Sequence, residues 1–205
     1  MMGPSVVRTL EALGLVVGFG TVTAAVVAPQ SPVKRFDERV MAGLARLRNE
    51  TIDWIVGPLS MLASQEPLTL QGLIAFVMLI VTIAGDAPKH FALTAIGSGI
   101  LSEVVKRTVA RPRPSGPRLI RWIRGSSYPS GDLLTATAIY LTIALIVSPH
   151  LPDGTARLAL FTIVTGLLAL LAACRVYVGV HHPSDVVGGI LLGAAWALFV
   201  SAWFV

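Results

Sequence analysis

Long apolar runs separated by short polar segments dominate the pattern of this chain. Six of these runs are close to the length of about 17–25 residues with which an α-helix crosses a lipid bilayer. Pro and Gly residues punctuate the segments between them. The third run also contains Ser and Glu residues, which lower its hydrophobicity. The predicted spans are Leu10–Ala28, Leu68–Ala84, Lys89–Val105, Leu133–Ser148, Leu158–Cys174 and Val186–Val205.

A different periodicity follows the first span. In Lys34–Asn49, the apolar residues Phe36, Val40, Leu44 and Leu47 recur at helical spacing, with basic residues around them. This pattern predicts an amphipathic helix. Such a helix either lies in the plane of the membrane interface or packs on the bundle of spanning helices, and the pattern is compatible with both.

Composition supports a membrane protein. The chain has 205 residues, of which 54% are hydrophobic and 13% charged, whereas soluble domains carry roughly 25% charged residues. The sequence therefore predicts an all-α integral membrane bundle of six transmembrane helices plus an interfacial amphipathic helix, in a single domain over residues 1–205. The net charge of +5 resides mainly in loops between apolar spans. This placement favours lipid phosphate and the bilayer as partners over nucleic acid.

Three short polar stretches stand out in this oily chain. They are Lys106–Pro114 (KRTVARPRP), Pro129–Asp132 (PSGD) and Arg175–Asp185 (RVYVGVHHPSD). If six spans alternate in direction, all three stretches reach the same membrane face. Together they supply cations, a hydroxyl, an imidazole and carboxylates, which suit phosphoryl transfer, where positioning and positive charge do most of the work. The sequence therefore predicts a phosphate-transfer site at that face.

The third stretch contains the candidate nucleophile. His181 can form a covalent intermediate through its imidazole, and Asp185 follows four residues later, where it can orient the ring. His182 is an adjacent competitor, and spacing alone does not choose between the two histidines. Both could also be ordinary interfacial loop residues.

Several further groups are candidates for binding phosphate. Arg175 ends the fifth span, where an ionisable residue is costly unless it is paired or used. Ser130 and Gly131 begin the fourth span, where free N–H groups and a close backbone approach suit an anion. The alternatives are lipid-headgroup anchors for the cations and helix N-caps for Ser130 and Asp132. The cations of the first stretch are Lys106, Arg107, Arg111 and Arg113.

The three stretches together resemble the signature of the type 2 phosphatidic acid phosphatase family, the lipid phosphate phosphatases. The matching pattern is Lys106-x6-Arg113-Pro114, then Pro129-Ser130-Gly131, then Arg175-x5-His181-x3-Asp185. The resemblance covers about residues 68–205. It implies a metal-independent hydrolase without a cofactor, which works through a phosphohistidine.

The resemblance also implies a role for each matching residue. His181 would attack phosphorus, and the register selects it over His182. Asp185 would orient the ring. The cations Lys106, Arg113 and Arg175 would bind the phosphate oxygens. The Ser130 hydroxyl and the Gly131 backbone amide would assist them.

Two positions depart from the family pattern. Cys174 replaces the usual Ser, for which we expect a small effect, and Asp132 replaces the His that is taken to protonate the leaving oxygen. A carboxylic acid can supply that proton when burial keeps it protonated, whereas surrounding cations favour the carboxylate. Three interpretations remain open: an active variant with a catalytic Asp132, a weakened or inactive homologue, and an engineered substitution.

The resulting prediction is a membrane lipid phosphatase. Its substrate would be a polyprenyl pyrophosphate, phosphatidylglycerol phosphate or phosphatidic acid, which enters laterally from the bilayer. One alternative is a catalytically impaired homologue that binds lipid phosphates, and another is a phosphotransferase that uses an acceptor other than water. For a pyrophosphate the leaving group is itself a phosphate, so we expect Asp132 to be better tolerated with lipid pyrophosphates than with monophosphates.

Membrane orientation gives two conflicting predictions. Of the 16 Lys and Arg residues, all but Arg8, Lys89 and Arg157 lie on the side of the three stretches, so the positive-inside rule places that side in the cytoplasm. The family resemblance instead implies a bacterial inner (plasma) membrane with the active site facing the periplasm, and phosphate-binding cations weaken the charge rule. Residues of the third loop are headgroup contacts or membrane anchors: Arg118, Arg121, Trp122 and Arg124.

Overall fold

The computed structural model describes residues 3–83, 85–116, 118–120, 123 and 125–204, and within these residues the regular secondary structure is helical. Two α-helices, α6 and α8, continue into single 3-10 turns, η1 (Ser148–His150) and η2 (Ala202–Phe204). The α-helices are α1 (Pro4–Val27), α2 (Pro32–Leu47), α3 (Glu50–Met61), α4 (Gln65–Thr82), α5 (Ala87–Val109), α6 (Gly131–Val147), α7 (Gly154–Tyr177) and α8 (Pro183–Ser201).

Local sequence signals explain where several helices begin. α2 starts at Pro32 behind Ser31, whose hydroxyl accepts a hydrogen bond from Lys34 N at 3.2 Å. α7 starts behind Asp153, whose carboxylate accepts a hydrogen bond from Ala156 N at 2.8 Å. A side-chain oxygen at this position satisfies an N–H group that the first turn leaves free, and the fixed φ of proline suits the first turn.

The predicted spans correspond to helices, but the count of six is not confirmed. Among the described residues, five helices are long and apolar enough to cross a membrane: α1, α4, α6 with η1, α7, and α8 with η2. The third predicted span forms α5, which is not apolar enough to be one of these five helices. Its polar residues, which include Lys89, His90, Glu103, Lys106 and Arg107, are the reason.

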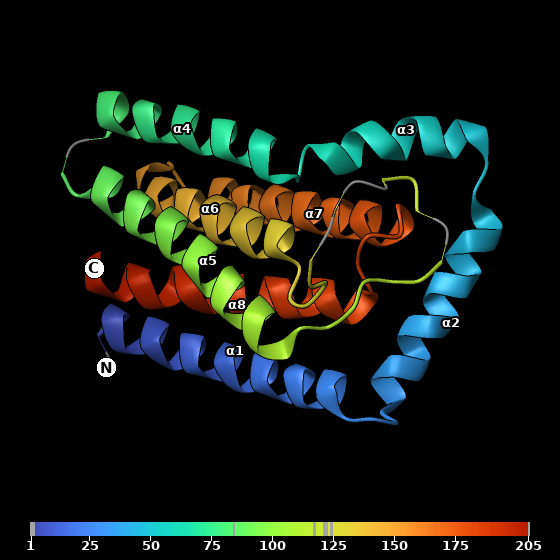
Figure 1. The fold of residues 1–205 in the computed structure, drawn as a ribbon. Coiled ribbons are helices and arrows are strands. Elements are labelled where there is room, and N and C mark those ends of the chain that lie inside the picture. The colour runs from blue at the N-terminus through green and yellow to red at the C-terminus, as the bar shows by residue number, and fades with distance from the viewer. Residues whose placement is uncertain (1–2, 84, 117, 121–122, 124, 205) are drawn as a thin grey trace.

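The long helices run roughly along one direction, and α2 crosses one end of the bundle (Figure 1). α6 and α8 pack against each other at the centre, α1 covers α8, and α5 and α7 flank α6. The two chain ends lie at the opposite end of the bundle from α2. Apolar side chains remain exposed along the outside, as lipid-facing residues would, for example Val17 at 69%, Val81 at 76% and Ile163 at 68%.

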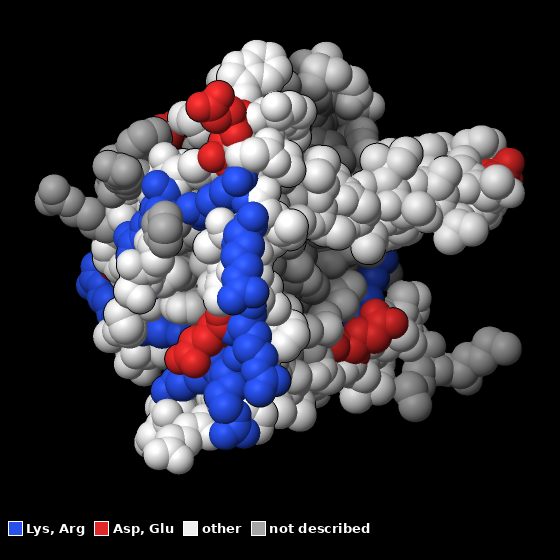
Figure 2. All heavy atoms as spheres, turned by 90° about the vertical axis from the view of Figure 1, so that its right-hand side faces the viewer, with Lys and Arg blue, Asp and Glu red and all other residues white. Residues whose placement is uncertain are grey.

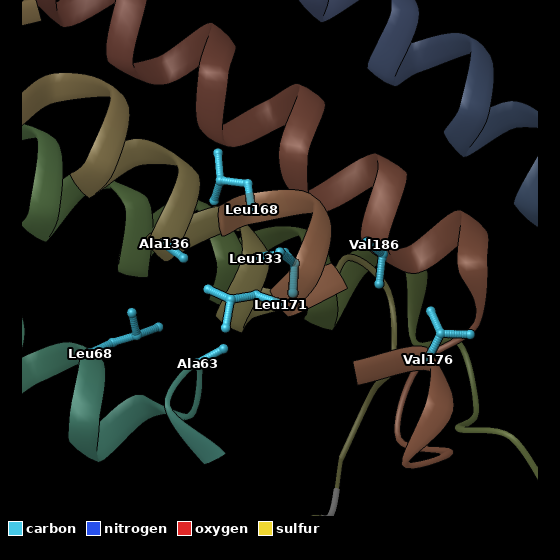
Figure 3. Close-up of a cluster of buried hydrophobic side chains, with 8 residues drawn as sticks. All are labelled: Ala63, Leu68, Leu133, Ala136, Leu168, Leu171, Val176 and Val186. Atoms are coloured by element: carbon cyan, nitrogen blue, oxygen red, sulfur yellow. The ribbon is translucent and has the colours of Figure 1, made fainter. Parts of the chain in front are cut away.

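The core lies where α6, α7 and α8 meet the start of α4. Figure 3 shows the buried side chains of this core cluster, which come from these helices and from the turn before α4: Ala63, Leu68, Leu133, Ala136, Leu168, Leu171, Val176 and Val186. A small residue permits the tightest contact between α8 and α6. A Cβ atom on Gly189 would lie 2.6 Å from the carbonyl oxygen of Ser130, which is too close for any side chain.

Helix α2 packs on the bundle, which is one of the two alternatives for the predicted amphipathic helix. Val40 and Leu44 contact the core cluster, whereas Phe36 and Leu47 are 57% and 62% exposed. The polar side of α2 also reaches inward, since Asp37 is fully buried. The helix therefore attaches to the bundle by apolar contacts and by one charged residue.

Candidate active site

The three polar stretches meet at the end of the bundle that α2 crosses (Figure 1). α5 and α7 end there, and α6 and α8 begin there, because antiparallel neighbours bring alternate ends together. A cavity of about 280 Å³ lies between them. It is lined by Lys106, Arg113, Asp132, Arg175 and His181, together with Met61, Ser64, Gln65, Glu66, Ile120 and Ile123.

This end of the molecule is basic. Figure 2 looks onto it and shows a continuous band of Lys and Arg side chains, and α2 contributes exposed Arg35, Arg39 and Arg46 to this end. Arg118 of the α5–α6 loop donates a hydrogen bond to the Pro114 carbonyl through Nε at 2.9 Å. The other predicted headgroup contacts, Arg121, Trp122 and Arg124, lie outside the described residues.

Two of the cavity cations are held by protein oxygens. Arg113 donates to the Val180 carbonyl at 2.8 Å and to the Ser126 carbonyl at 3.3 Å. Burial lowers the pKa of Arg113, and the nearby Arg118 charge lowers it further. Arg175 is 1% exposed and donates to the Ser60 carbonyl at 3.3 Å. Fixed guanidinium groups of this kind are suited to binding phosphate oxygens.

Arg175 is also paired with Asp132. The Nη2 of Arg175 donates to Oδ2 of Asp132, and the same oxygen lies 3.7 Å from Nε2 of His181. Among the described residues, Nε of Arg175 has no hydrogen-bond partner. The Asp132 carboxylate thus lies between the candidate nucleophile and one of the candidate phosphate-binding cations.

His181 lies in the turn between α7 and α8, which begins at Gly179 with a φ of 80°, a conformation that glycine adopts without strain. Nδ1 of His181 lies 2.9 Å from the Ser127 carbonyl oxygen. A carbonyl only accepts, so Nδ1 carries the proton and Nε2 keeps its free electron pair. Burial lowers the pKa of His181 to about 4, so the ring is uncharged near neutral pH.

Asp185 does not contact His181 as closely as the motif suggests. Its Oδ2 lies 3.8 Å from Nδ1 of His181, beyond hydrogen-bond distance, and accepts hydrogen bonds from His182 N at 2.8 Å and His182 Nδ1 at 3.2 Å. His182 caps α8 and lines neighbouring cavities instead of the one at His181. The Ser127 carbonyl, not the Asp185 carboxylate, makes the direct hydrogen bond to the candidate nucleophile.

Ser130 and Gly131 occupy structural positions at the start of α6. Ser130 is the N-cap, and its hydroxyl accepts a hydrogen bond from Leu133 N at 3.4 Å. A Cβ atom on Gly131 would lie 2.6 Å from both Lys106 Nζ and Ser102 Oγ. Gly131 therefore lets Lys106 lie against the first turn of α6. Neither residue is among the described residues that line the cavity.

Sequence reasoning missed two contributors to this site. The Ser127 carbonyl belongs to the backbone, so no residue type signals its role. Ser60 of α3 binds Arg175 from a segment 115 residues away in the chain, and an isolated serine in an apolar run carries no signal either.

Known proteins resemble this chain in both sequence and fold. Phosphatidylglycerophosphatase B of Bacillus subtilis (strain 168) is 36% identical over 95 residues, which cover 46% of this chain and 46% of that protein. Lipid A 1-phosphatase of Rhizobium johnstonii is 30% identical over 124 residues, which cover 56% of this chain and 47% of that protein. The chain thus spans about half the length of the curated relatives it matches.

Two crystal structures share the fold. A PAP2-type phosphatidylglycerolphosphate phosphatase from Bacillus subtilis superposes with a TM-score of 0.85 at 24% identity, over 95% of this chain and 96% of that chain. Aquifex aeolicus LpxE superposes with a TM-score of 0.61 at 23% identity, over 80% of this chain and 93% of that chain. These likenesses establish the helical membrane fold.

The family model itself covers the helices that build the cavity. The PAP2 superfamily model matches residues 87–205, which is more than half of the chain and includes all three polar stretches. The resemblance inferred from those stretches is therefore confirmed, and the apolar helices agree with it. This chain belongs to the PAP2 superfamily as an integral membrane protein.

Proposed function

We propose that this protein is a lipid phosphatase that hydrolyses a phosphate monoester or pyrophosphate of a membrane lipid. The observation that carries the proposal is the free Nε2 of a neutral His181 at the wall of a cavity that also holds Lys106, Arg113 and Arg175. The names of the relatives support this substrate class, because phosphatidylglycerophosphate and lipid A are phosphorylated membrane lipids.

The reaction proceeds in two steps. Nε2 of His181 attacks phosphorus, and a P–N bond forms as the P–O bond to the lipid breaks, which leaves a phosphohistidine. Water then attacks this phosphorus, and the P–N bond breaks as the new P–O bond forms. The protons of water leave with the inorganic phosphate, and neutral His181 is restored. Lys106, Arg113 and Arg175 stabilise the charge on the equatorial oxygens in both steps. Because side chains supply both the nucleophile and the positive charge, the scheme uses neither a metal ion nor a cofactor.

Asp132 takes part in both binding and proton transfer in this scheme. It holds Arg175 before substrate arrives, so a phosphate that binds Arg175 must displace the carboxylate. It also lies 3.7 Å from His181 Nε2, close to where a leaving oxygen would depart, so in its protonated form it can serve as the general acid. A lipid pyrophosphate needs this proton less than a monoester does, which favours pyrophosphates as substrates.

A second candidate function is a lipid-phosphate binder without turnover. The specific observation in its favour is the same Arg175–Asp132 pair, since an ionised Asp132 supplies no proton and neutralises one of the binding cations. Binding of lipid phosphate cannot distinguish the two functions, because the same residues serve both. A measurement of phosphate release can, since only the phosphatase turns over.

Access for the lipid tail is proposed to be lateral. An apolar cavity of about 450 Å³ lies between α4, α5 and α6, and Gln65 lines both this cavity and the one at His181. Leu68, Phe76, Phe91 and Ile139 are among its walls. A phosphorylated lipid could keep its chain in this apolar cavity while its phosphate reaches the cations.

We also propose that α5 is a sixth membrane-spanning helix and that the site faces the periplasm of a bacterial inner membrane. α5 has 23 residues and runs beside α6 (Figure 1). Its Thr94, Ser98 and Ser102 are buried within the protein, so they do not face lipid. The periplasmic orientation follows the family resemblance, in which the basic residues of this end bind phosphate.

Phosphate release from purified protein in detergent tests the proposed function. The substrates are a polyprenyl pyrophosphate, phosphatidylglycerol phosphate and phosphatidic acid, each in EDTA, with His181→Ala as the control. Release by the wild-type protein that disappears in His181→Ala supports the phosphatase. Equal release by the two proteins, when both are folded, would contradict it and favour the binder.

A further inference from the structure

A buried group of charged and polar side chains surrounds the Asp185 carboxylate, outside the cavity at His181. Its members are Asp37 of α2, Arg111 of the α5–α6 loop, and Ser184 and Asp185 of α8. Asp37 and Asp185 are fully buried, and the Arg111 side chain is 10% exposed. None of the four is among the described residues that line the cavity at His181. A buried charge costs free energy unless it is paired, so each charge in this group needs a partner within the group.

The Arg111 guanidinium bridges the two carboxylates. Its Nη2 donates to Asp37 Oδ2 at 2.8 Å, and its Nη1 donates to Asp185 Oδ1 at 2.6 Å. Asp37 in turn accepts hydrogen bonds from Ser184 N at 3.0 Å and Ser184 Oγ at 2.5 Å. A carboxylate from α2 thus satisfies a free N–H group in the first turn of α8, where negative charge is favourable.

This bridge fixes the Asp185 carboxylate relative to His181. Oδ1 of Asp185 is held by Arg111, and Oδ2 accepts from His182 N at 2.8 Å and lies 3.8 Å from His181 Nδ1. The Asp185 carbonyl also accepts a hydrogen bond from Ser130 N at 2.9 Å. When Nε2 of His181 bonds to phosphorus, the ring becomes positive, and a carboxylate at this distance stabilises it.

We propose that Asp37 and Arg111 are positioning residues, which hold the Asp185 carboxylate opposite His181 and so connect helix α2 to the reacting histidine. The inference rests on the proposed phosphatase function. Neither residue touches the cavity in which phosphate would bind, so the pair acts on the chemical step and leaves substrate binding unchanged.

Kinetics of Asp37→Asn and Arg111→Gln test this role. We expect kcat to fall by about 10²-fold, because small misplacements of a catalytic group have effects of that size, while KM stays within about twofold of wild type. The double variant should be no slower than the slower single variant, since the two residues act as one unit. A KM that rises with kcat unchanged would overturn the proposal.

A matched control makes the same chemical change elsewhere. Asp86, the N-cap of α5, pairs with Lys89 at 2.7 Å, and its side chain is 61% exposed. α5 begins at the end of the bundle opposite α2. Asp86→Asn also removes one carboxylate from an ion pair, and we expect it to leave kcat unchanged. Size-exclusion chromatography and thermal melting in detergent identify any variant that fails to fold.

A readout without turnover separates this inference from the proposed function. The chain has 4 histidines, so ¹⁵N-histidine NMR resolves the rings, and His181→Ala assigns the signal. We expect the His181 ring signals to shift in Asp37→Asn and Arg111→Gln but not in Asp86→Asn. Shifted signals in a protein whose wild type releases no phosphate would support the positioning role and contradict the phosphatase. Unchanged His181 signals in both folded variants would overturn the positioning role.

Discussion

The Asp132 carboxylate lies between the two groups that a substrate phosphate would contact. It accepts a hydrogen bond from Arg175 and lies 3.7 Å from His181 Nε2. A phosphate oxygen in the same place would make the same contacts, so we expect Asp132 to compete with substrate for Arg175. Under the proposed function, the carboxylate at position 132 therefore affects binding as well as proton transfer.

Replacing Asp132 with histidine should change turnover of phosphate monoesters more than turnover of pyrophosphates. In Asp132→His, we expect turnover of phosphatidic acid to rise by about 10²-fold, because a general acid contributes at least that much when the leaving group is an alkoxide. Turnover of a polyprenyl pyrophosphate should rise much less, since its leaving group is a phosphate. Initial rates on both substrates measure this.

Asp132→Asn is the matched control for that variant. It removes the charge that holds Arg175 but supplies no acid, so it reports the competition for phosphate alone. An equal gain on both substrates in Asp132→His would show that relief of the Arg175 pair, and not proton supply, is the effect of the histidine.

His181 should make the stability of the protein pH-dependent. Burial lowers its pKa from 6.5 to about 4, so between these values the unfolded chain binds a proton that the folded protein does not. The contribution of neutral His181 to the free energy of unfolding is therefore fully present above pH 6.5. It decreases by about 1.4 kcal/mol per pH unit as the pH falls toward 4. Thermal melting of wild type and His181→Gln between pH 7.5 and 4.5 tests it. Parallel pH dependence in the two proteins would contradict the buried neutral ring.

Residue types in the motifs indicated which side chains line the cavity, but not which groups form hydrogen bonds with them. His181, Lys106, Arg113, Arg175 and Asp132 line one cavity, as their motifs suggested. The partners of these groups come from backbone carbonyls and from segments far away in the chain, such as Ser60 in the case of Arg175. Hydrophobic patterns and motif spacing carry no information about either kind of partner.

At the scale of elements, apolar length predicted the helices, and five of the six predicted spans are long and apolar enough to cross a membrane. The predicted Lys89–Val105 run is part of a longer helix, α5, which extends to Val109 and carries Lys106 to the cavity. α5 falls outside the set of membrane-crossing helices because of its charged residues, among which Lys89, Glu103 and Arg107 have exposed side chains. The amphipathic pattern located α2, whereas the burial of Asp37 depends on Arg111, which lies 74 residues away.

Close packing of α8 on α6 should be sensitive to a single methyl group. Gly189→Ala places a Cβ atom 2.6 Å from the Ser130 carbonyl oxygen, which must shift, so we expect a loss of about 1–3 kcal/mol in stability. Gly166→Ala in α7 is the matched control, because its Cβ would meet nothing within 4 Å. In that variant we expect a gain of about 0.5–1 kcal/mol. Equal melting temperatures in detergent would contradict the tight α6–α8 contact.

At the scale of the whole molecule, two cavities with different chemistry adjoin. The polar cavity lies at the basic end of the bundle that Figure 2 shows, and the apolar cavity extends between α4, α5 and α6. Gln65 belongs to both. This arrangement matches an amphiphile whose phosphate lies at the membrane surface and whose chain stays in the apolar layer.

Filling the apolar cavity should therefore discriminate against long lipids. Gly99 lines this cavity, and a Cβ atom there would meet nothing within 4 Å, so Gly99→Phe adds an aromatic ring at the cavity wall without a clash at Cβ. We expect KM for a long-chain lipid phosphate to rise about tenfold or more, because each buried CH₂ group contributes about 0.8 kcal/mol to binding and several would be displaced. Activity on a water-soluble short-chain phosphate ester should not change. Gly20→Phe in α1, where a Cβ atom also has open space, controls for the added aromatic ring. If both variants slow both substrates equally, the lipid chain does not bind between α4, α5 and α6, and the route from the bilayer to His181 lies elsewhere.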